Sequence, residues 1–403
     1  MPRGSGWDAG AVLVLLLLVA AGLGIYHYAV GLFHGSEKDL VDLALASYLI
    51  LLSGPLAHYA GLPVALIEIL LGVTASATGA HRGEGLRLLG EIGANMVLFM
   101  AGAEIDVALL RRRSKEALAL ALLVIAGPLL AVPAFPVSGG SRLLLAAALA
   151  PTSVAITYAI LQPTGLVRGR TGQVVLAAAM ISDVAGMILL NLAGGGWSPV
   201  SALYIVVILA ALALYPLFPR LGSVGFEAEV RIVMMAILVL GVASELLGIH
   251  SVLTSFILGL VVGETVRARR ILREKLEGMV FGFFAPFFFI TSGLTINSSL
   301  LLKYLPTILA LGTIVFLAKA LPAHIYLTLT GRARHGAAKL YSASLAPLLT
   351  VTVIAAETGL RQGQIGEETY TLLLGIVIMT TLISGIASRI YGKGLEIPEK
   401  HYH

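Results

Sequence analysis

Long apolar runs recur along almost the whole chain, and they constrain the fold more than any other feature. A helix that crosses the hydrocarbon core of a bilayer needs about 20 predominantly apolar residues. Only 12% of the 403 residues are charged and 58% are hydrophobic, whereas a soluble domain carries about 25% charged residues. The sequence therefore predicts an all-α polytopic membrane protein and excludes a soluble protein built around one core.

Gly, Pro and charged residues divide the apolar runs into fourteen candidate spans. The first could instead be a signal peptide with Arg3 at its positive flank, although its apolar run is longer than that of a signal. The expected spans cover residues 10–33, 39–60, 63–79, 86–105, 116–138, 141–162, 171–194, 200–218, 229–248, 250–265, 277–297, 305–328, 337–359 and 370–390.

The basic residues predict how the spans are oriented. With both termini in the cytoplasm, all but seven of the 27 Lys and Arg lie on the cytoplasmic side, as the positive-inside rule requires. Lys319 falls in the middle of a span, and six lie outside: Lys38, Arg82, Arg87, Arg142, Lys303 and Arg361. The net charge of +5 is thus explained by a lipid bilayer rather than by a nucleic-acid partner. An Ala-, Gly- and Leu-rich chain with few Lys favours the plasma membrane of a prokaryote.

Three short matches recur in the same order in the two halves of the chain. The matched pairs are residues 63–72 with 251–259, 102–106 with 293–297, and 148–151 with 344–347, at separations of 188, 191 and 196 residues. Because an odd number of spans separates the copies, the second copy is expected to be inverted in the membrane. Inverted repeats are typical of secondary transporters, whose site lies near the midplane.

The repeats define the expected organisation of the chain. It comprises an extra N-terminal helix (residues 1–38), a first inverted repeat (39–194), a connecting helix and loop (195–227), a second inverted repeat (228–391) and a short cytoplasmic tail (392–403).

Pro151 and Pro347 occupy matching places inside two long apolar helices. A proline inside a helix removes one backbone hydrogen bond and frees a carbonyl, which membrane proteins tolerate only next to protein or a wet cavity. Hydroxyl residues follow each proline: Thr152, Ser153 and Thr157 after the first, and Thr350 and Thr352 after the second. The pattern predicts two discontinuous crossing helices at the transport site, with harmless kinks as the alternative.

Asp183 lies near the middle of an apolar span. A charge at that depth costs several kcal/mol and normally marks an ion or proton pathway, and the same cost favours the protonated form. Such a carboxyl can hold a proton or coordinate a monovalent cation, with further oxygens from Ser182, Thr152 and Ser153. The alternative is a structural Asp satisfied by a buried Lys.

Lys319 is the second charge at apolar depth. It could pair with Asp183, meet the carbonyls of the broken-helix crossing, or lose its proton during transport. Glu68 and Asn95 are auxiliary candidates with Thr350. A satisfied core Glu explains Glu68 equally well, and an Asn that joins two helices explains Asn95 better.

The sequence holds no enzyme signature. It has no phosphate-binding loop between strand and helix, no zinc-spaced His/Cys set and no nucleophile motif in context, and it has no Cys. We therefore expect neither an enzyme nor a cofactor.

Several motifs occur in order between about residues 40 and 391. They are Leu62-Pro63 with Gly72, Glu91-Ile-Gly followed by residues 98–106, Pro151-Thr-Ser-Val-Ala-Ile156, Ile181-Ser-Asp-Val-Ala-Gly186, residues 257–263 and residues 286–296. This ordered set resembles the monovalent cation:proton antiporter superfamily, which includes sodium/proton antiporters and potassium efflux antiporters.

The resemblance implies a homodimer in which a bundle of broken helices moves in an elevator-like cycle. It also implies that Asp183 carries the cation and the proton, and that Lys319 matches a lysine of electrogenic sodium antiporters. Those members carry two adjacent acids, whereas this chain has Ser182 before Asp183.

The sequence therefore predicts electroneutral exchange of a monovalent cation, Na⁺ before K⁺, for a proton. The alternatives are a potassium/proton efflux antiporter of the same superfamily, and a cation channel or non-transporting scaffold.

Overall fold

The computed structural model describes residues 9–30, 36–104, 114–135, 142–193, 225–246, 251–333 and 335–392, and their regular structure is helical throughout. The chain divides into two compact units. One contains residues 1–106 and 195–298, and the other contains residues 107–194 and 299–403. Each unit therefore combines segments from both halves of the sequence.

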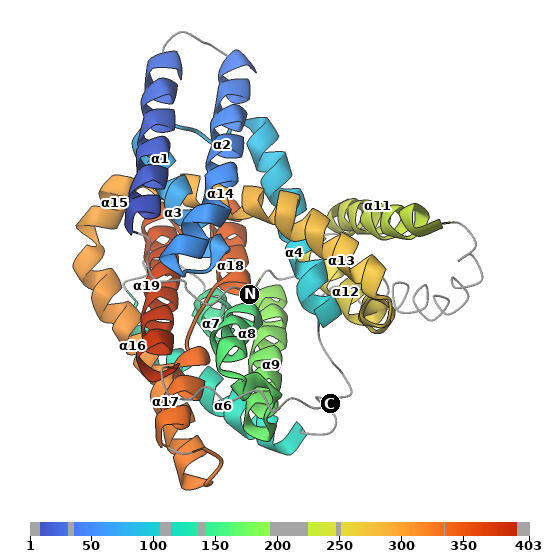
Figure 1. Cartoon of the computed structure of the whole chain (residues 1–403), viewed down its shortest axis with the longest axis vertical. Helices are drawn as coiled ribbons and strands as arrows, with labels where there is room; N and C mark the ends of the chain where they lie inside the picture. Colours follow the sequence, from blue (N-terminus) through green and yellow to red (C-terminus); the bar gives the residue numbers. More distant parts are fainter. Residues whose placement is uncertain are drawn as a thin grey trace. The chain divides into compact units, whose positions relative to one another are not determined.

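The first unit is built from α-helices, two of which are joined by a π-helical turn into one continuous helix (Figure 1). Its elements are α1 (Ala9–Val30), α2 (Ser36–Ala60), α3 (Val64–Ala77), α4 (Glu84–Glu104), α11 (Gly225–Leu246), α12 (Ser251–Ala268), α13 (Arg270–Met279), the π-turn η5 (Val280–Phe284) and α14 (Ala285–Leu294).

Glycines let two pairs of helices in this unit approach closely. A Cβ on Gly72 of α3 would collide with the Ile290 carbonyl of α14, and a Cβ on Gly293 of α14 would approach Gly72 in return. In the second pair, a Cβ on Gly102 of α4 would collide with the Phe256 carbonyl of α12, and a Cβ on Gly259 of α12 would collide with the Phe99 carbonyl of α4. Small residues are the usual means of close helix packing in a membrane. The repeat thus appears in the packing, because α3 with α14 and α4 with α12 are equivalent pairs.

The first expected span forms α1, which lies beside α2 (Figure 1). The Tyr26 hydroxyl on α1 donates to Asp42 Oδ1 on α2 at 2.5 Å, and the Tyr48 hydroxyl on α2 donates to the Leu18 carbonyl at 2.8 Å. Tyr26 and Asp42 are almost fully buried. Since buried polar groups need partners, these bonds fix the register of the two helices.

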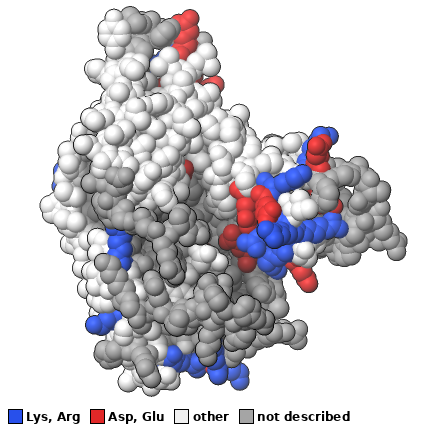
Figure 2. Space-filling view, viewed as in Figure 1, with Lys and Arg blue, Asp and Glu red and all other residues white. Residues whose placement is uncertain are grey.

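Charged side chains of the first unit concentrate over α13 and its neighbours (Figure 2). Three ion pairs lie there: Arg269 with Glu229, Arg270 with Glu274, and Arg273 with Glu277. By contrast, α1 exposes large apolar side chains such as Leu13, Leu17 and Ile25. An exposed apolar surface of this kind suits a lipid environment.

The second unit contains two interrupted helices among continuous ones (Figure 1). Its elements are α6 (Ser114–Ala131), the 3₁₀ turn η1 (Val132–Ala134), α7 (Arg142–Leu149), α8 (Val154–Leu161), the 3₁₀ turns η2 (Gln162–Thr164) and η3 (Leu166–Arg168), α9 (Arg170–Ala193), α15 (Ser298–Lys303), α16 (Leu305–Leu329), α17 (His335–Ser344), α18 (Thr350–Arg361) and α19 (Glu367–Gly392).

Eight helical stretches among the described residues are long and apolar enough to cross a membrane, and α3 is a shorter apolar helix. The prediction of an all-α membrane protein is confirmed. The expected spans 141–162 and 337–359 each consist of two helices joined by an extended segment, so both proline breaks are confirmed. The expected span at 200–218, most of the connector at 195–227 and nearly all of the tail at 392–403 lie outside the described residues.

Candidate functional site: two broken helices around Lys319 and Asp183

The first break lies between α7 and α8, at residues 150–153. Pro151 has no N–H and cannot continue the α7 ladder. Ser153 caps α8, because its hydroxyl oxygen accepts from the Ile156 N–H at 3.4 Å, which satisfies one of the free donors at a helix start. The carbonyls of Ala150 and Pro151 accept hydrogen bonds from Lys319 of α16, outside the interrupted helix.

The second break lies between α17 and α18, at residues 345–349. Helix α19 satisfies part of it with hydroxyl groups. The Leu348 N–H donates to Thr380 Oγ1 at 3.4 Å, the Thr381 hydroxyl donates to the Leu348 carbonyl at 3.3 Å, and the Ser384 hydroxyl donates to the Ala343 carbonyl at 2.9 Å. All three hydroxyl residues are buried.

The two breaks hydrogen-bond to each other. Four bonds link them: Thr152 Oγ1 to the Leu345 carbonyl at 2.9 Å, Thr157 Oγ1 to the Ser344 carbonyl at 2.7 Å, Thr352 Oγ1 to the Ala148 carbonyl at 2.7 Å, and the Ser153 N–H to the Pro347 carbonyl at 3.0 Å. Because donors come from both sides, each interruption completes the hydrogen bonding of the other. The alternative of two harmless kinks does not describe this crossing.

Lys319 of α16 reaches the first break and is fully buried, with 0% of its surface exposed. Its ammonium donates to the Ala150 carbonyl at 3.0 Å, to the Pro151 carbonyl at 2.5 Å and to Thr152 Oγ1 at 3.1 Å. An ammonium has three N–H donors, and these three oxygens account for all of them. Of the roles open for Lys319, meeting the carbonyls of the broken helix is therefore observed.

Asp183 lies in the middle of α9 and is partly exposed. It interacts electrostatically with Lys319. One turn further along α9, Gly186 packs so closely on Pro151 that a Cβ would collide with the proline ring. This contact brings the α9 segment that carries Asp183 against the first break. Ser182 is buried, and its hydroxyl donates to the Ala178 carbonyl of its own helix at 3.0 Å.

The remaining predicted site residues have different surroundings. Thr350 is the first residue of α18 and is partly exposed. Glu68 and Asn95 belong to the first unit. Glu68 is buried and accepts from the Ser53 hydroxyl at 3.1 Å, and Asn95 Oδ1 accepts from the Ser255 hydroxyl of α12 at 3.3 Å. Both have the helix-joining contacts that the sequence allowed as an alternative.

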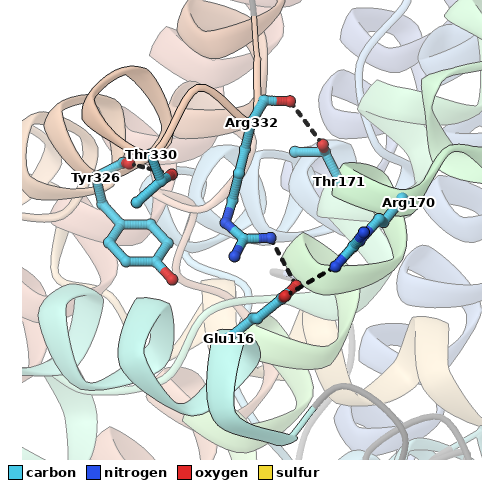
Figure 3. A network of polar contacts seen from close by, with 6 residues as sticks. All are labelled: Glu116, Arg170, Thr171, Tyr326, Thr330 and Arg332. Carbon is cyan, nitrogen blue, oxygen red and sulfur yellow. Dashed lines mark hydrogen bonds and ion pairs between the residues drawn. The ribbon is translucent and has the colours of Figure 1, made fainter.

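A polar network ties the ends of three helices in the second unit (Figure 3). Glu116 of α6 accepts from Arg170 of α9 at 3.1 Å and from Arg332, which follows α16, at 2.6 Å. The Thr171 hydroxyl donates to the Arg332 carbonyl at 2.8 Å. We call Glu116, Arg170, Thr171 and Arg332 the clamp. It joins the two helices that carry Asp183 and Lys319.

Sequence reasoning missed the clamp and the hydroxyl residues of α19. The run Thr380-Thr381 with Ser384 in an apolar span was the available signal for the second group. It is a weak one, since Thr and Ser in membrane helices often bond back to their own helix, as Thr380 also does to the Ile376 carbonyl. Sequence reasoning also passed over the buried bond from the Tyr370 hydroxyl to Glu357 Oε1 at 2.9 Å.

A family of proteins described as "Sodium/hydrogen exchanger, transmembrane" matches residues 45–393. The chain belongs to this sodium/hydrogen exchanger family. The predicted kinship is thereby confirmed, and the exchanger is a multi-pass membrane cation/proton antiporter rather than an enzyme. Residues 9–30 of α1 precede the matched region.

Individual relatives agree with this assignment. The exchanger is 28% identical over 328 residues to "Probable Na(+)/H(+) antiporter 3" of Methanocaldococcus jannaschii, across 75% of this chain and 83% of the relative. It is 27% identical over 356 residues to "Na(+)/H(+)-K(+) antiporter GerN" of Bacillus cereus, across 83% and 91%. In fold it is similar to the sodium proton antiporter MjNhaP1 of Methanocaldococcus jannaschii, with a TM-score of 0.63 and 18% identity, across 88% of this chain and 97% of that one.

The described residues contain no group of three His, Cys, Asp or Glu side chains that could hold a metal ion.

Proposed function

We propose that the exchanger carries one cytoplasmic Na⁺ outward for each proton it admits, with Asp183 as the group that holds either ion in turn. The observation that carries this proposal is the position of Asp183: mid-helix, partly exposed and packed beside the first break. A carboxyl at membrane depth can release a proton to bind a cation and take up a proton to release it.

Further oxygens for the cation come from neighbouring hydroxyl groups. The Ser182 and Thr152 hydroxyls already donate their protons to carbonyls, at 3.0 and 2.9 Å. The Ser182 oxygen keeps two lone pairs for an ion, and the Thr152 oxygen, which also accepts from the Lys319 ammonium at 3.1 Å, keeps one. The Ser153 oxygen likewise keeps one lone pair, because it accepts from the Ile156 N–H. The auxiliary candidates for binding the cation remain Glu68, Asn95 and Thr350.

Electroneutral exchange follows from the charges around the first break. One carboxyl that alternates between one cation and one proton moves no net charge. Ser182 stands where a second acid would add another titrating group, and the three donors of Lys319 are held by oxygens of the break. Both features favour a lysine whose charge stays in place during the cycle.

Substitution of Asp183 tests the proposal directly. In proteoliposomes that contain a pH-sensitive dye, Asp183→Asn should abolish the cation-dependent dissipation of an imposed pH gradient. Glu367→Gln is the matched control, since Glu367 is an exposed acid at the start of α19 in the same unit. Transport by Asp183→Asn at the rate of the unmodified protein would refute the assignment.

An imposed membrane potential tests electroneutrality separately. The initial rate should be the same at positive, zero and negative potential in liposomes of equal cation and proton gradients. A rate that changes steeply with potential would show that Lys319 also moves charge.

K⁺ is the second candidate cargo, because one relative is named as an Na⁺/H⁺-K⁺ antiporter. The same liposomes with Na⁺, Li⁺, K⁺ or Rb⁺ across a range of pH decide between the cations. A lower half-saturating concentration for K⁺ than for Na⁺ would favour the potassium/proton exchanger.

The proposal extends to an elevator-like cycle of a homodimer in a prokaryotic plasma membrane, with both termini in the cytoplasm. In support, both breaks, Asp183 and Lys319 belong to one compact unit, which can move as a body. The chain has no Cys, so single Cys substitutions at Lys38 and Arg361 can be labelled in intact cells without background. Labelling from the cytoplasmic side alone would contradict the orientation.

A further inference from the structure

The oxygen atoms that bind the Lys319 ammonium have the composition of a cation-binding site. Two backbone carbonyls and one hydroxyl oxygen, those of Ala150, Pro151 and Thr152, surround a fully buried positive charge at 2.5–3.1 Å. We propose that these three oxygens, here called the cradle, form a monovalent-cation site of their own, which Lys319 occupies as a tethered cation. A free cation similar in size to an ammonium should fill the cradle when the lysine side chain is removed.

The cradle is held in place by contacts that do not involve Lys319. The Ala150 N–H donates to the Ala146 carbonyl at 2.9 Å, which anchors the end of α7. The Pro151 ring packs against Gly186 of α9. The Thr152 hydroxyl donates to the Leu345 carbonyl at 2.9 Å, so its lone pairs remain directed to Lys319. Because these contacts survive loss of the lysine, the oxygens should keep their positions.

The ligand chemistry selects the class of cation. All three ligands are neutral, and potassium channels likewise replace the hydration shell of their ion with backbone carbonyls. Divalent cations need more oxygens and several carboxylates, which the cradle lacks. The nearby charge of Asp183 favours any cation there. The site should therefore take K⁺, Rb⁺ or NH₄⁺ in preference to the smaller Na⁺ and Li⁺.

The inference goes beyond the proposed function and does not depend on Asp183 being the carrier. In the unmodified protein the lysine fills the cradle, and only one lone pair of the Thr152 hydroxyl oxygen remains open to another cation. A variant without the lysine should therefore bind one monovalent cation more than the unmodified protein.

Thermal unfolding of the purified full-length protein in detergent tests the inference. Lys319→Ala empties the cradle and leaves space for an ion with its remaining waters, whereas Lys319→Met fills the same space with an apolar chain. Each protein is melted in choline, Li⁺, Na⁺, K⁺ and Rb⁺ chloride at equal ionic strength. For Lys319→Ala, K⁺ and Rb⁺ should raise Tm by about 2 °C or more relative to Na⁺ at saturating concentration. Lys319→Met should show no such order.

The double variant Lys319→Ala/Asp183→Asn separates the cradle from the proposed transport site. In this double variant, K⁺ and Rb⁺ should still raise Tm more than Na⁺ does. The rise should be smaller than in Lys319→Ala, because the neighbouring negative charge is lost. If the order disappears in the double variant, the cation had bound to Asp183 and the cradle is not a site.

Lys319→Ser, which can hold a water, is the second variant if Lys319→Ala does not fold in choline. Either variant should then be obtained as folded protein in K⁺ or Rb⁺ chloride. Two results would overturn the inference: equal effects of all cations on Lys319→Ala and on the unmodified protein, or failure of both variants to fold in every salt while Lys319→Met folds.

Discussion

The two breaks of the second unit begin with the same sequence match, yet different chemistry satisfies them. At the first break one ammonium bonds to two carbonyls and a hydroxyl. At the second break Thr380, Thr381 and Ser384 of α19 share the task, one bond each. A hydrogen bond to a charged group contributes about 1.5–3 kcal/mol and a neutral one about 0.5–1.5 kcal/mol. The Ala150 and Pro151 carbonyls of the first break thus depend on one residue, whereas several α19 residues satisfy the second break.

The two breaks also differ in the charge that they place near Asp183. Hydroxyl groups cap the second break without adding a charge, while Lys319 places a positive charge beside Asp183. Under the proposed function, a cation or proton held by Asp183 would meet the electrostatic field of this lysine. We infer that the first break takes part in the chemistry of exchange and that the second mainly maintains the crossing.

Lys319→Met should produce the largest change in stability. It leaves the Ala150 and Pro151 carbonyls without a donor, and each unpaired buried acceptor costs about 1–3 kcal/mol. We expect the free energy of unfolding in detergent to fall by about 2–4 kcal/mol. Lys303→Met is the control, because the Lys303 side chain is 63% exposed and should change stability by less than about 0.5 kcal/mol. Equal effects of the two substitutions would show that the first break does not depend on its charge.

Three smaller losses are expected at the second break. Thr380→Val, Thr381→Val and Ser384→Ala should each lower the free energy of unfolding by about 1 kcal/mol, since each removes one neutral hydrogen bond to the break. The triple variant should lose about 3 kcal/mol if the residues act independently.

Thr313→Val is the matched control for these three variants. Its hydroxyl bonds only to the Leu309 carbonyl of its own helix at 2.7 Å in an exposed position. A triple variant no less stable than this control would contradict the view that hydroxyl groups satisfy the second break.

Sequence reasoning located the breaks and the charges but not all of their partners. Pro151, Pro347, Asp183 and Lys319 stand out because their residue types conflict with an apolar helix. Which oxygens Lys319 reaches depends on how α16 is rotated against α7, and hydropathy carries no information on rotation. The α19 hydroxyls were missed for a related reason: a Thr that joins two helices and a Thr that bonds to its own helix have the same sequence pattern.

The division of the structure into two compact units was likewise not predicted from the sequence. The expected boundaries follow the two repeats, at residues 39–194 and 228–391, and each compact unit takes helices from both. Close glycine contacts join α3 to α14 and α4 to α12, so helices from the two expected repeats share one packed body.

The clamp should contribute least. Glu116→Gln removes an acceptor whose side chain is 23% exposed, with Arg332 22% exposed and Arg170 65% exposed, and exposed ion pairs contribute about 0–1 kcal/mol. Arg332→Gln should cost more than Arg170→Gln because the Arg332 side chain is less exposed. Unfolding measured at low and high choline chloride should show the loss shrinking with salt, since screening weakens such pairs. A loss from Glu116→Gln as large as that from Lys319→Met would mean that the position of α16, rather than the bonds at the first break, stabilises the second unit. In that case the contrast between a charged and a hydroxyl-capped break would no longer explain the stability of this unit.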